Sequence, residues 1–311
     1  MRKLFSVFIL LNIFFLSSCD DGDVITVDLD FDNSFEACDG GDALVFYKTK
    51  EDPSESLSLK LDNVNLEDIF NVDEFGVFEE TYTISTTNPF NYRTYSNTSL
   101  PNNLFCSVIP NSEIKITQDI ESTSGNAILK TVLTEDDNDG IPAELENRDP
   151  NGDGNYDDAQ DTDGDGLPDY IDADDDGDNV LTKNEDPDPN GDGDLSDALD
   201  TDNDGTPDYL DTDDDGDGID TRNEENDSQD QNPANDISVS EFGPDYLNKD
   251  VANEETPVAT AYREHTITQS YLVTLEISNF DLEIISLDVF NFGVLSDSNT
   301  TSSRKVTPDF P

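Results

Sequence analysis

The chain has 311 residues, 74 of them Asp or Glu and only 15 Lys or Arg, which gives a formal net charge of −59. This imbalance excludes nucleic acid as a partner and excludes electrostatic attachment to anionic lipid, because both require a basic surface. A single His excludes a zinc site with two His ligands. No G-x-S-x-G, H-E-x-x-H or phosphate-binding Gly-Lys-Ser pattern occurs, so we predict that the protein is not an enzyme.

The N-terminus predicts export. A basic start precedes an apolar run over residues 4–16, which is long enough for the core of a signal peptide but short for a membrane span. The run ends in L-S-S-C at Cys19, which resembles the lipobox of bacterial lipoproteins. The resemblance implies that a signal peptide over 1–18 is removed and that a lipid on Cys19 anchors the protein in a membrane. The alternative is an ordinary signal peptide followed by an unmodified Cys.

An acidic leader over 19–23 places Asp20 and Asp21 directly after Cys19. In enteric bacteria an Asp there resembles an inner-membrane retention signal, whereas in Bacteroidetes-type lipoproteins acidic residues there resemble a surface-export signal. We expect the second, an outer-membrane lipoprotein exposed at the cell surface.

Two further cysteines remain, Cys38 and Cys106. An even pair in an exported protein favours a disulfide between them. The alternative is two free, buried thiols. The spacing does not resemble the C-x-x-C arrangement of redox pairs.

Two segments have the alternation and the Thr, Val, Ile and Tyr content of β-strands. In the first, 24–134, we predict strands around 24–29, 43–47, 57–61, 78–84, 104–109, 114–116 and 127–133. In the second, 231–311, we predict them around 237–239, 262–268, 271–277 and 282–295. The sequence therefore predicts a mainly β protein with an antiparallel β-sandwich body. The second segment either completes the sandwich across an inserted middle part, which we favour, or forms a small separate β domain.

The middle of the chain, 135–230, has a different composition. It contains 39 Asp and Glu against 3 Lys and Arg, a net charge of −36, and its only aromatic residues are tyrosines. Such a composition cannot form a packed apolar core, so another agent must fold it.

This middle part repeats with a period of 39 residues, and its units contain calcium-loop spacings. Carboxylates at alternate positions of a tight loop can turn inward onto one ion, and a Gly at position 6 brings the distal ligand back. One loop type supplies Asp at positions 1, 3, 5, 9 and 12, in two copies: Asp161, Asp163, Asp165, Asp169 and Asp172, then Asp200, Asp202, Asp204, Asp208 and Asp211. We predict that these side chains bind Ca²⁺, which accepts six to eight oxygen ligands.

A second loop type ends in Glu, whose longer side chain can bind an ion through both oxygens, as in an EF-hand. Its copies contain Asp174, Asp176, Asp178 and Glu185, then Asp213, Asp215, Asp217 and Glu224. A related loop begins at Glu135 and contains Asp137, Asp139 and Glu146. A third type is incomplete and would bind weakly or borrow a ligand from a neighbour: Asp149, Asn151, Asp153 and Asp157, then Asp188, Asn190 and Asp192.

The segments DTDGDGLPDYID and DTDNDGTPDYLD resemble thrombospondin type 3 repeats, over about 135–226. The resemblance implies an array of loops packed around several calcium ions with little apolar core. The cysteines that link repeats in that family are missing here, so its disulfides are not implied. A dockerin module is the nearest rival, but these back-to-back loops leave no room for dockerin helices. The other alternative is an acidic, solvated linker.

Three aromatic or imidazole side chains need an interpretation. Tyr170 and Tyr209 share one repeat position and predict a packing contact between repeats, with a sugar-binding platform as the alternative. His265 stands among Thr and Glu residues, and we predict that it is an exposed residue of a strand.

Together these features predict a calcium-binding surface lipoprotein that acts as a structural or adhesive module, its array serving as a stiff spacer or interaction arm. Its partners would be the membrane, through the lipid, and a protein or glycan at the cell surface. The alternative function is a carbohydrate-binding or carbohydrate-active outer-membrane lipoprotein.

Overall fold

The structure is a computed structural model that describes residues 29–39, 42–107, 111–225, 230–251, 261–282 and 288–310. The predicted signal peptide, Cys19 and the acidic leader lie outside the described residues. Within the described ranges, no helix is both long and apolar enough to cross a membrane.

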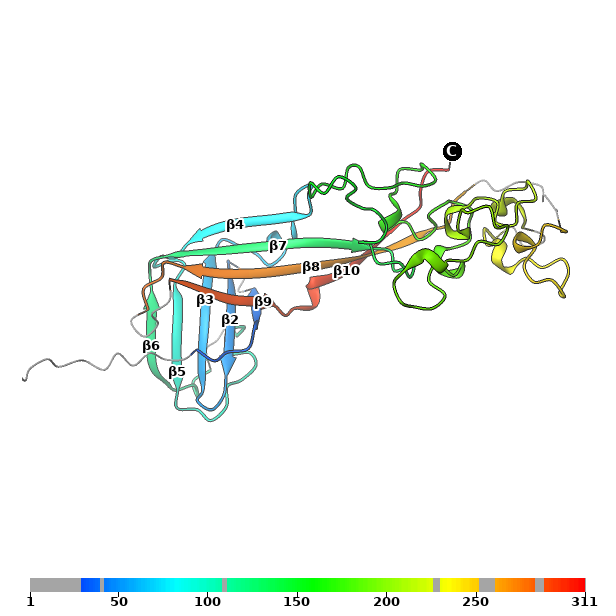
Figure 1. The fold of residues 1–311 in the computed structure, drawn as a ribbon. Coiled ribbons are helices and arrows are strands. Elements are labelled where there is room, and N and C mark those ends of the chain that lie inside the picture. Colours follow the sequence, from blue (N-terminus) through cyan, green and yellow to red (C-terminus); the bar gives the residue numbers. More distant parts are fainter. Residues whose placement is uncertain are drawn as a thin grey trace, which may run out of the picture.

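The protein is mainly β, as predicted, and its strands form one hydrogen-bonded sheet (Figure 1). The strand order is β4-β7-β8-β9-β1-β2-β3-β5-β6, and β10 pairs with β8 beside this path. All pairs are antiparallel except β1 with β9, which is parallel. The strands are β1 Ser34–Asp39, β2 Ala43–Lys50, β3 Glu55–Asp62, β4 Val77–Thr83, β5 Phe90–Tyr95, β6 Ile116–Ser122, β7 Asn126–Asp136, β8 His265–Ser278, β9 Val289–Leu295 and β10 Thr301–Val306.

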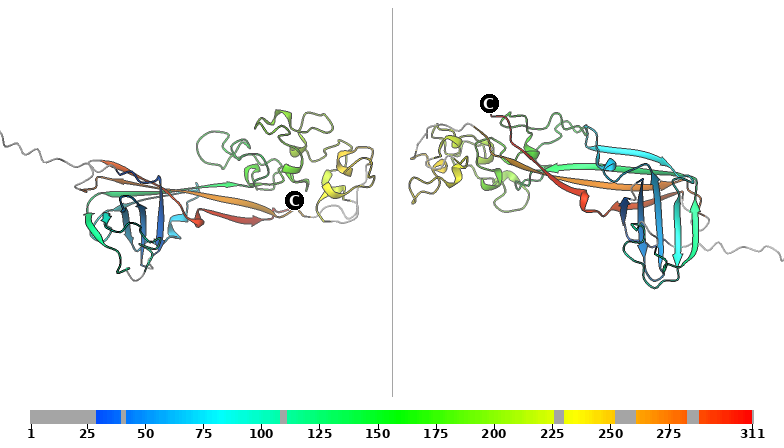
Figure 2. Two further views of the ribbon diagram at one scale, coloured as in Figure 1. Left: turned by 90° about the horizontal axis from the view of Figure 1, so that it is seen from below. Right: turned by 180° about the vertical axis from the view of Figure 1, so that it is seen from behind.

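The sheet folds over at the β9–β1 junction, so that its two halves cross steeply and face each other (Figures 1 and 2). Strands β2, β3, β5 and β6 form one layer, and β4, β7, β8 and β9 form the other. One apolar core fills the space between them, with contributions from both layers. Phe35 of β1 packs on Phe46 and on Phe292, with ring centroids 5.3 and 5.4 Å apart, and so joins the layers. This arrangement resembles orthogonally packed sheets, in which strands of the two layers cross near right angles.

Alternation along each strand decides which side chains enter this core, because successive residues of a strand point to opposite faces. In β8, Val273, Leu275 and Ile277 are buried, while Leu272 before them and Glu276 among them are exposed. The period-two pattern that predicted this strand therefore reflects the real division between core and solvent.

Both predicted β segments contribute to the sheet. β7 ends at Asp136, immediately before the Asp-rich segment, and β8 begins at His265, soon after it. These two strands are hydrogen-bonded neighbours, and Asp136 lies opposite Thr268. The long β7–β8 ladder, with β10 at its side, extends from the body as a stem that carries the Asp-rich segment at its end (Figure 1). A continuous β-ladder, and not a loose linker, thus connects the two parts.

Two expected strands are wrong. Residues 104–106 lie in turns and 107 in irregular backbone, with 108 and 109 outside the described residues. Residues 237–239 lie in a loop, where Ile237 and Val239 are largely exposed and Ser238 donates its backbone N–H to the Asp245 carboxylate. In the described part of the chain, no strand lies beside either segment to pair with it. Local alternation alone therefore gave a wrong prediction in both places.

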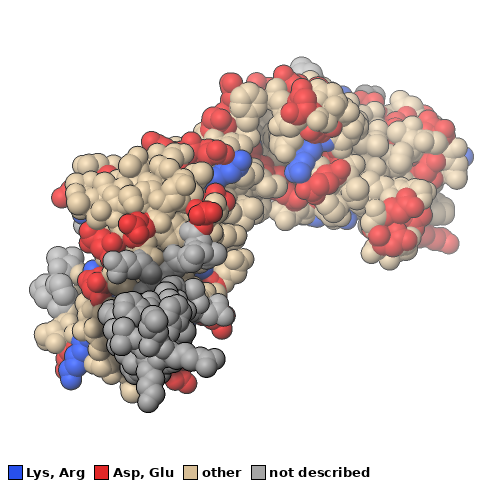
Figure 3. All heavy atoms as spheres, turned by 60° about the vertical axis from the view of Figure 1, so that its left-hand side comes forward, with Lys and Arg blue, Asp and Glu red and all other residues tan. Residues whose placement is uncertain are grey.

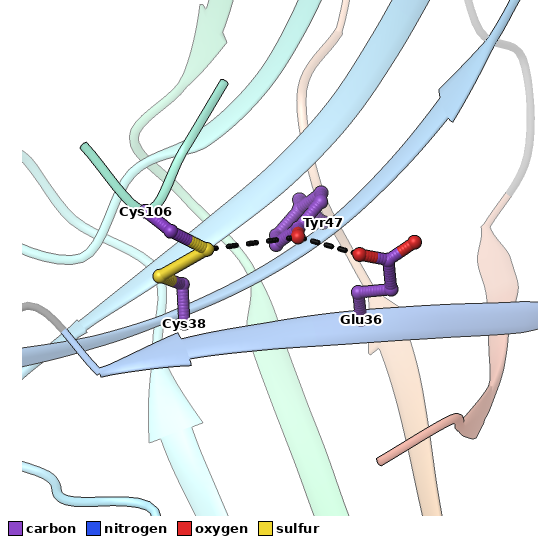
Figure 4. The surroundings of a disulfide bond; sticks show 4 residues. All are labelled: Glu36, Cys38, Tyr47 and Cys106. Atoms are coloured by element: carbon purple, nitrogen blue, oxygen red, sulfur yellow. Dashed lines mark hydrogen bonds between the residues drawn. A yellow bond between two sulfur atoms is a disulfide. The ribbon is translucent and has the colours of Figure 1, made fainter. Parts of the chain in front are cut away.

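The predicted disulfide is confirmed: Cys38 of β1 is bonded to Cys106 in the loop after β5, with 5.3 Å between their Cα atoms (Figure 4). Tyr47 of β2 lies beside it. Its hydroxyl donates a 2.6 Å hydrogen bond to Glu36 and lies 3.7 Å from the Cys106 sulfur. The disulfide therefore ties an otherwise irregular loop to the β1–β2 ladder.

Replacing both cysteines by Ser should destabilise the body without affecting the Asp-rich segment. The bond joins residues 68 apart in sequence, and closing a loop of that size stabilises a fold by about 4 kcal/mol in the chain-entropy model. Chemical denaturation followed by far-UV circular dichroism should show the loss, while calorimetric calcium uptake should equal that of the unaltered protein. An unchanged unfolding midpoint would contradict this prediction.

Candidate metal centres

The Asp-rich segment is built from tight turns. In 137–225 and 230–251, the described residues form short 3-10 turns and bends but no α-helix or β-strand. The turns are η2 Asp169–Ile171, η3 Thr182–Asn184, η4 Leu195–Asp197, η5 Asp208–Leu210, η6 Thr221–Asn223, η7 Pro233–Asn235 and η8 Asp245–Leu247. Two more, η1 Asp68–Phe70 and η9 Ser298–Thr300, belong to the body. We call 137–251 the array; it lies at the far end of the stem (Figure 1).

Alternate aspartates of a loop share one local geometry. One carboxylate oxygen accepts the backbone N–H two residues further on, as from Asp178 to Asp176 at 3.1 Å and from Val180 to Asp178 at 2.6 Å. Asp163 and Asp165 repeat this at 3.0 and 2.7 Å. Such turns fix each side chain and leave its second oxygen free for another partner.

The most enclosed group of carboxylates, the central cluster, consists of Asp176, Asp178, Glu185 and Asp214. Oxygens of all four lie within 4.8 Å of one another, and each residue is at most 2% exposed. One oxygen of Asp176 and of Asp178, and both oxygens of Glu185 and Asp214, are buried without a hydrogen-bond partner. Buried charges are normally paired or bound to a metal, so this arrangement fits a divalent cation with oxygen ligands.

Electrostatics of the ion-free chain support the same conclusion. Burial, followed by repulsion from neighbouring carboxylates, raises the pKa of Asp176 and of Glu185 well above the usual range. The four carboxylates cannot all remain ionised at this spacing unless a cation lies among them.

A first cluster, nearer the body, has the same design 39 residues earlier. Oxygens of Asp137, Asp139 and Glu146 lie within 4.8 Å of one another, and all three side chains are buried. Burial, with repulsion from Asp137 and Asp139, raises the pKa of Glu146 to about 10. Both oxygens of Glu146 lack a hydrogen-bond partner.

The central cluster is joined by an Asp from the following loop. Asp214 belongs to the loop after the central cluster, and 39 residues earlier stands Asp175. Asp175 is buried, and this burial raises its pKa well above the usual range. The charges of Asp139, Asp169 and Glu146 raise the pKa of Asp175 further. A carboxylate from one unit therefore helps to enclose the candidate ion of the unit before it.

Neither Asp175 nor Asp214 was predicted from the sequence. Both stand at position 2 of a loop, where the spacing rule expects no ligand. The signal was present in the triplets Asp174–Asp176 and Asp213–Asp215, since a loop that uses positions 1 and 3 leaves the middle Asp unexplained.

Three further candidate groups are more open to solvent: Asp161, Asp163 and Asp165; Asp200, Asp202 and Asp204; and Asp213, Asp215 and Asp217. The last group lies near Glu224. Burial of the Glu224 side chain, followed by repulsion from Asp215, raises the pKa of Glu224 to about 9. The structure thus brings together the ligands predicted at positions 3 and 5 in each complete loop.

The predicted position-9 ligands make specific local bonds. Each oxygen of Asp169 accepts one bond from Thr162, from its backbone N–H and its hydroxyl, both at 2.8 Å. Asp208 and Thr201 repeat this at 2.7 Å. These aspartates therefore clamp the start of a loop to its end.

In the incomplete loops the first carboxylate is satisfied within its own loop. Both oxygens of Asp149 accept backbone N–H groups, from Gly152, Asp153 and Gly154. Asp188 repeats these three bonds in the second copy. Their neighbours Asn151, Asp153, Asp157, Asn190 and Asp192 are exposed.

The array contains a third, shortened unit beyond the predicted end at residue 230. Ser238 donates its N–H to Asp245 at 2.7 Å, as Thr201 does to Asp208, and the Asp245 N–H bonds to the Asp236 carbonyl at 3.0 Å. Tyr246 is buried like Tyr209. The P-D-Y motif at 244–246 was the sequence signal, masked by a shorter period and lost ligands.

His265 is not the exposed strand residue that was predicted. It is 2% exposed, and its Nδ1 lies 2.7 Å from an oxygen of Asp172. Beside it, Arg263 donates to the Asn179 carbonyl at 3.2 Å, and Ile267 packs with the array residues Leu167 and Ile171. The returning chain therefore threads along the first repeat and attaches it to the stem.

Comparison with known proteins gives one partial match. Residues 136–196 match the family model described as BamM C-terminal, which is well under half of the chain. The match begins at the end of β7 and covers the first cluster and the Asp161 loop, and it is consistent with a bacterial protein associated with the outer membrane. Neither the curated proteins nor the solved structures include a match.

Proposed function

We propose that this protein is a calcium-binding lipoprotein of the bacterial outer membrane, exposed at the cell surface, whose array is a stiff arm. The observation that carries the proposal is the central cluster, with four buried carboxylates and six oxygens that lack partners. Its near-copy 39 residues earlier makes a chance grouping of acidic side chains a poor explanation.

Calcium suits these groups better than other divalent ions. The ligands are carboxylate oxygens only, which excludes the thiolate and imidazole sets that select zinc or copper. A cluster that offers four carboxylates within a few ångströms matches the high coordination number of Ca²⁺, whereas Mg²⁺ keeps most of its water ligands. Asp176, Asp178, Glu185 and Asp214 would hold one ion, and Asp137, Asp139, Glu146 and Asp175 another.

The stem supports the role of an arm. The first described residues, Leu29 and Phe31, pack against the core of the body, whereas the array lies at the opposite end of the molecule (Figure 2). A lipid on Cys19 would therefore hold the body near the membrane and present the array away from it. The surface is dominated by Asp and Glu among its charged residues (Figure 3), which keeps it off anionic lipid.

Anchoring and exposure can be tested in a Gram-negative host. We expect the unaltered protein to enter the detergent phase and to be removed from intact cells by added protease. Cys19→Ser should abolish the incorporation of labelled fatty acid and leave the signal peptide attached, because no thiol remains to receive a lipid. Ser18→Ala, which keeps a small residue before Cys19, is the matched control and should behave as the unaltered protein. Fatty-acid labelling that is the same in Cys19→Ser, or full protection of the unaltered protein from protease on intact cells, would contradict the proposal.

A further inference from the structure

A cavity of about 380 Å³ lies where the array meets the body. One wall is the hairpin loop before β4, residues 72–76, together with Leu133 and Glu135 near the end of β7. The opposite wall comes from the array, residues 154–157 with Arg148 and Tyr170. The volume lies within the range of small-ligand sites.

Aromatic side chains stand on both walls. Tyr156 and Tyr170 meet edge to face with their ring centroids 5.7 Å apart. The Arg148 guanidinium lies 5.2 Å from the centre of the Tyr156 ring and is held by Glu144 at 2.9 Å. Across the cavity, Phe75 is 51% exposed, although an apolar ring of this size is normally covered.

The second repeat shows which of these residues the calcium loops require. At the 39-residue offset the loop ligands are kept, Asp149 as Asp188 and Asp153 as Asp192. The cavity residues are not kept: Arg148, Asn155, Tyr156 and Asp157 correspond to Pro187, Asp194, Leu195 and Ser196. Arg148 and Tyr156 therefore occur only in the unit that faces the body, whereas Tyr170 recurs as Tyr209, and loop formation does not explain Arg148 and Tyr156.

The polar groups of the cavity are well held and mixed in kind. The Asp73 carboxylate accepts the backbone N–H groups of Phe75 and Val77 at 3.0 and 2.9 Å, which fixes the hairpin loop. Glu135 is bound by Arg304 through both oxygens, at 2.9 and 3.3 Å. Arg148 and Asn155 supply donors. Four acidic side chains against one basic side chain line the cavity, which disfavours an anionic ligand.

We propose that this cavity binds a neutral oligosaccharide. A sugar ring presents C–H groups on its faces, which pack on aromatic rings such as Phe75 and Tyr156. Its hydroxyls both donate and accept, and so they suit a wall that mixes Arg148, Asn155 and carboxylates. A cationic ligand would need acceptors alone and would meet Arg148.

This inference goes beyond the calcium arm, because it assigns a ligand to the place where the arm joins the body. Since one wall belongs to the array, the site is complete only when the first repeat is folded. Sugar binding is therefore expected to require calcium, whereas calcium uptake is not expected to require sugar.

The test uses the full mature chain at saturating calcium. Calorimetry and saturation-transfer NMR would probe neutral oligosaccharides of glucose, galactose, mannose and N-acetylglucosamine, with oligogalacturonate as the anionic probe. We expect at least one neutral oligosaccharide to bind and the anionic probe not to bind. Tyr156→Ala and Phe75→Ala should each weaken binding by roughly tenfold or more, because each removes an aromatic surface.

Leu195→Ala, at the matching position of the second repeat, is the control and should leave sugar binding unchanged. Calcium uptake, measured on each variant, should equal that of the unaltered protein, so that a loss of sugar binding is separable from a loss of array folding. If no neutral oligosaccharide binds the calcium-loaded chain, or if both aromatic variants bind as well as the control, the proposal is overturned even where the calcium results hold.

Discussion

Removing calcium should expand the array while the β body stays folded. Residues 135–230 carry a net charge of −36, and like charges about 6 Å apart repel by roughly 0.7 kcal/mol per pair even in water. At ~1 mM calcium and a dissociation constant of ~0.1 mM, each occupied site adds about 1.4 kcal/mol of stability by mass action. The body has its own apolar core and its disulfide, so we expect it to stay folded when calcium is removed.

Endoproteinase Glu-C offers a sharp readout, because it cuts after residues that the clusters bury. Glu146, Glu185 and Glu224 are 6%, 2% and 1% exposed. They should resist cleavage with calcium and become cleavable with chelator, while small-angle scattering reports a larger radius. The exposed Glu67 and Glu113 of the body serve as internal controls that should be cut equally in both conditions. Equal cleavage of the three buried glutamates with and without calcium would show that the array is an acidic linker.

Asp214→Asn should weaken calcium binding at the central cluster although Asp214 lies outside the loop that supplies the other three ligands. Hydrogen bonds and contacts of a charged group are worth about 1.5–3 kcal/mol, so we expect affinity at this site to fall tenfold or more. The ion-free chain should respond in the opposite direction. There the substitution removes one of four mutually repelling carboxylates, and the array should be equally compact or more compact than in the unaltered protein.

The control for this variant is Asp158→Asn, which makes the same charge change at an exposed position of the array. Calorimetric titration would compare the two, and it should find a weakened site only in Asp214→Asn. A similar effect in both variants would mean that net charge, and not coordination, governs calcium uptake.

The sequence predicted those parts of the structure that depend on local spacing. Period-two alternation located β2, β3 and the core half of β8, and loop spacing located Asp176, Asp178 and Glu185. It failed where a residue's surroundings come from distant parts of the chain. The residues next to His265 in the sequence are polar and predict that it is exposed. Its partner in the structure, Asp172, is remote in sequence.

The same reason explains why Asp175 and Asp214 and the extra unit were missed. Asp175 and Asp214 acquire their role only when successive units pack together, which no spacing rule within one loop describes. The third unit kept its Asp245 clamp but few carboxylates, so composition placed it with the β segment. In both cases the information was in the repeat comparison, and not in the loop pattern.

The attachment of the array to two adjacent strands also has a mechanical consequence. Both ends of the array leave from the same end of the stem, since β7 and β8 are antiparallel neighbours. A load that draws the array away from an anchored body would therefore run along the axes of both strands. Ladder hydrogen bonds lie perpendicular to the strands. The load would consequently shear the hydrogen bonds that join β7 to β4 and β8 to β9. Many of these hydrogen bonds would resist together, whereas in unzipping they would break one after another.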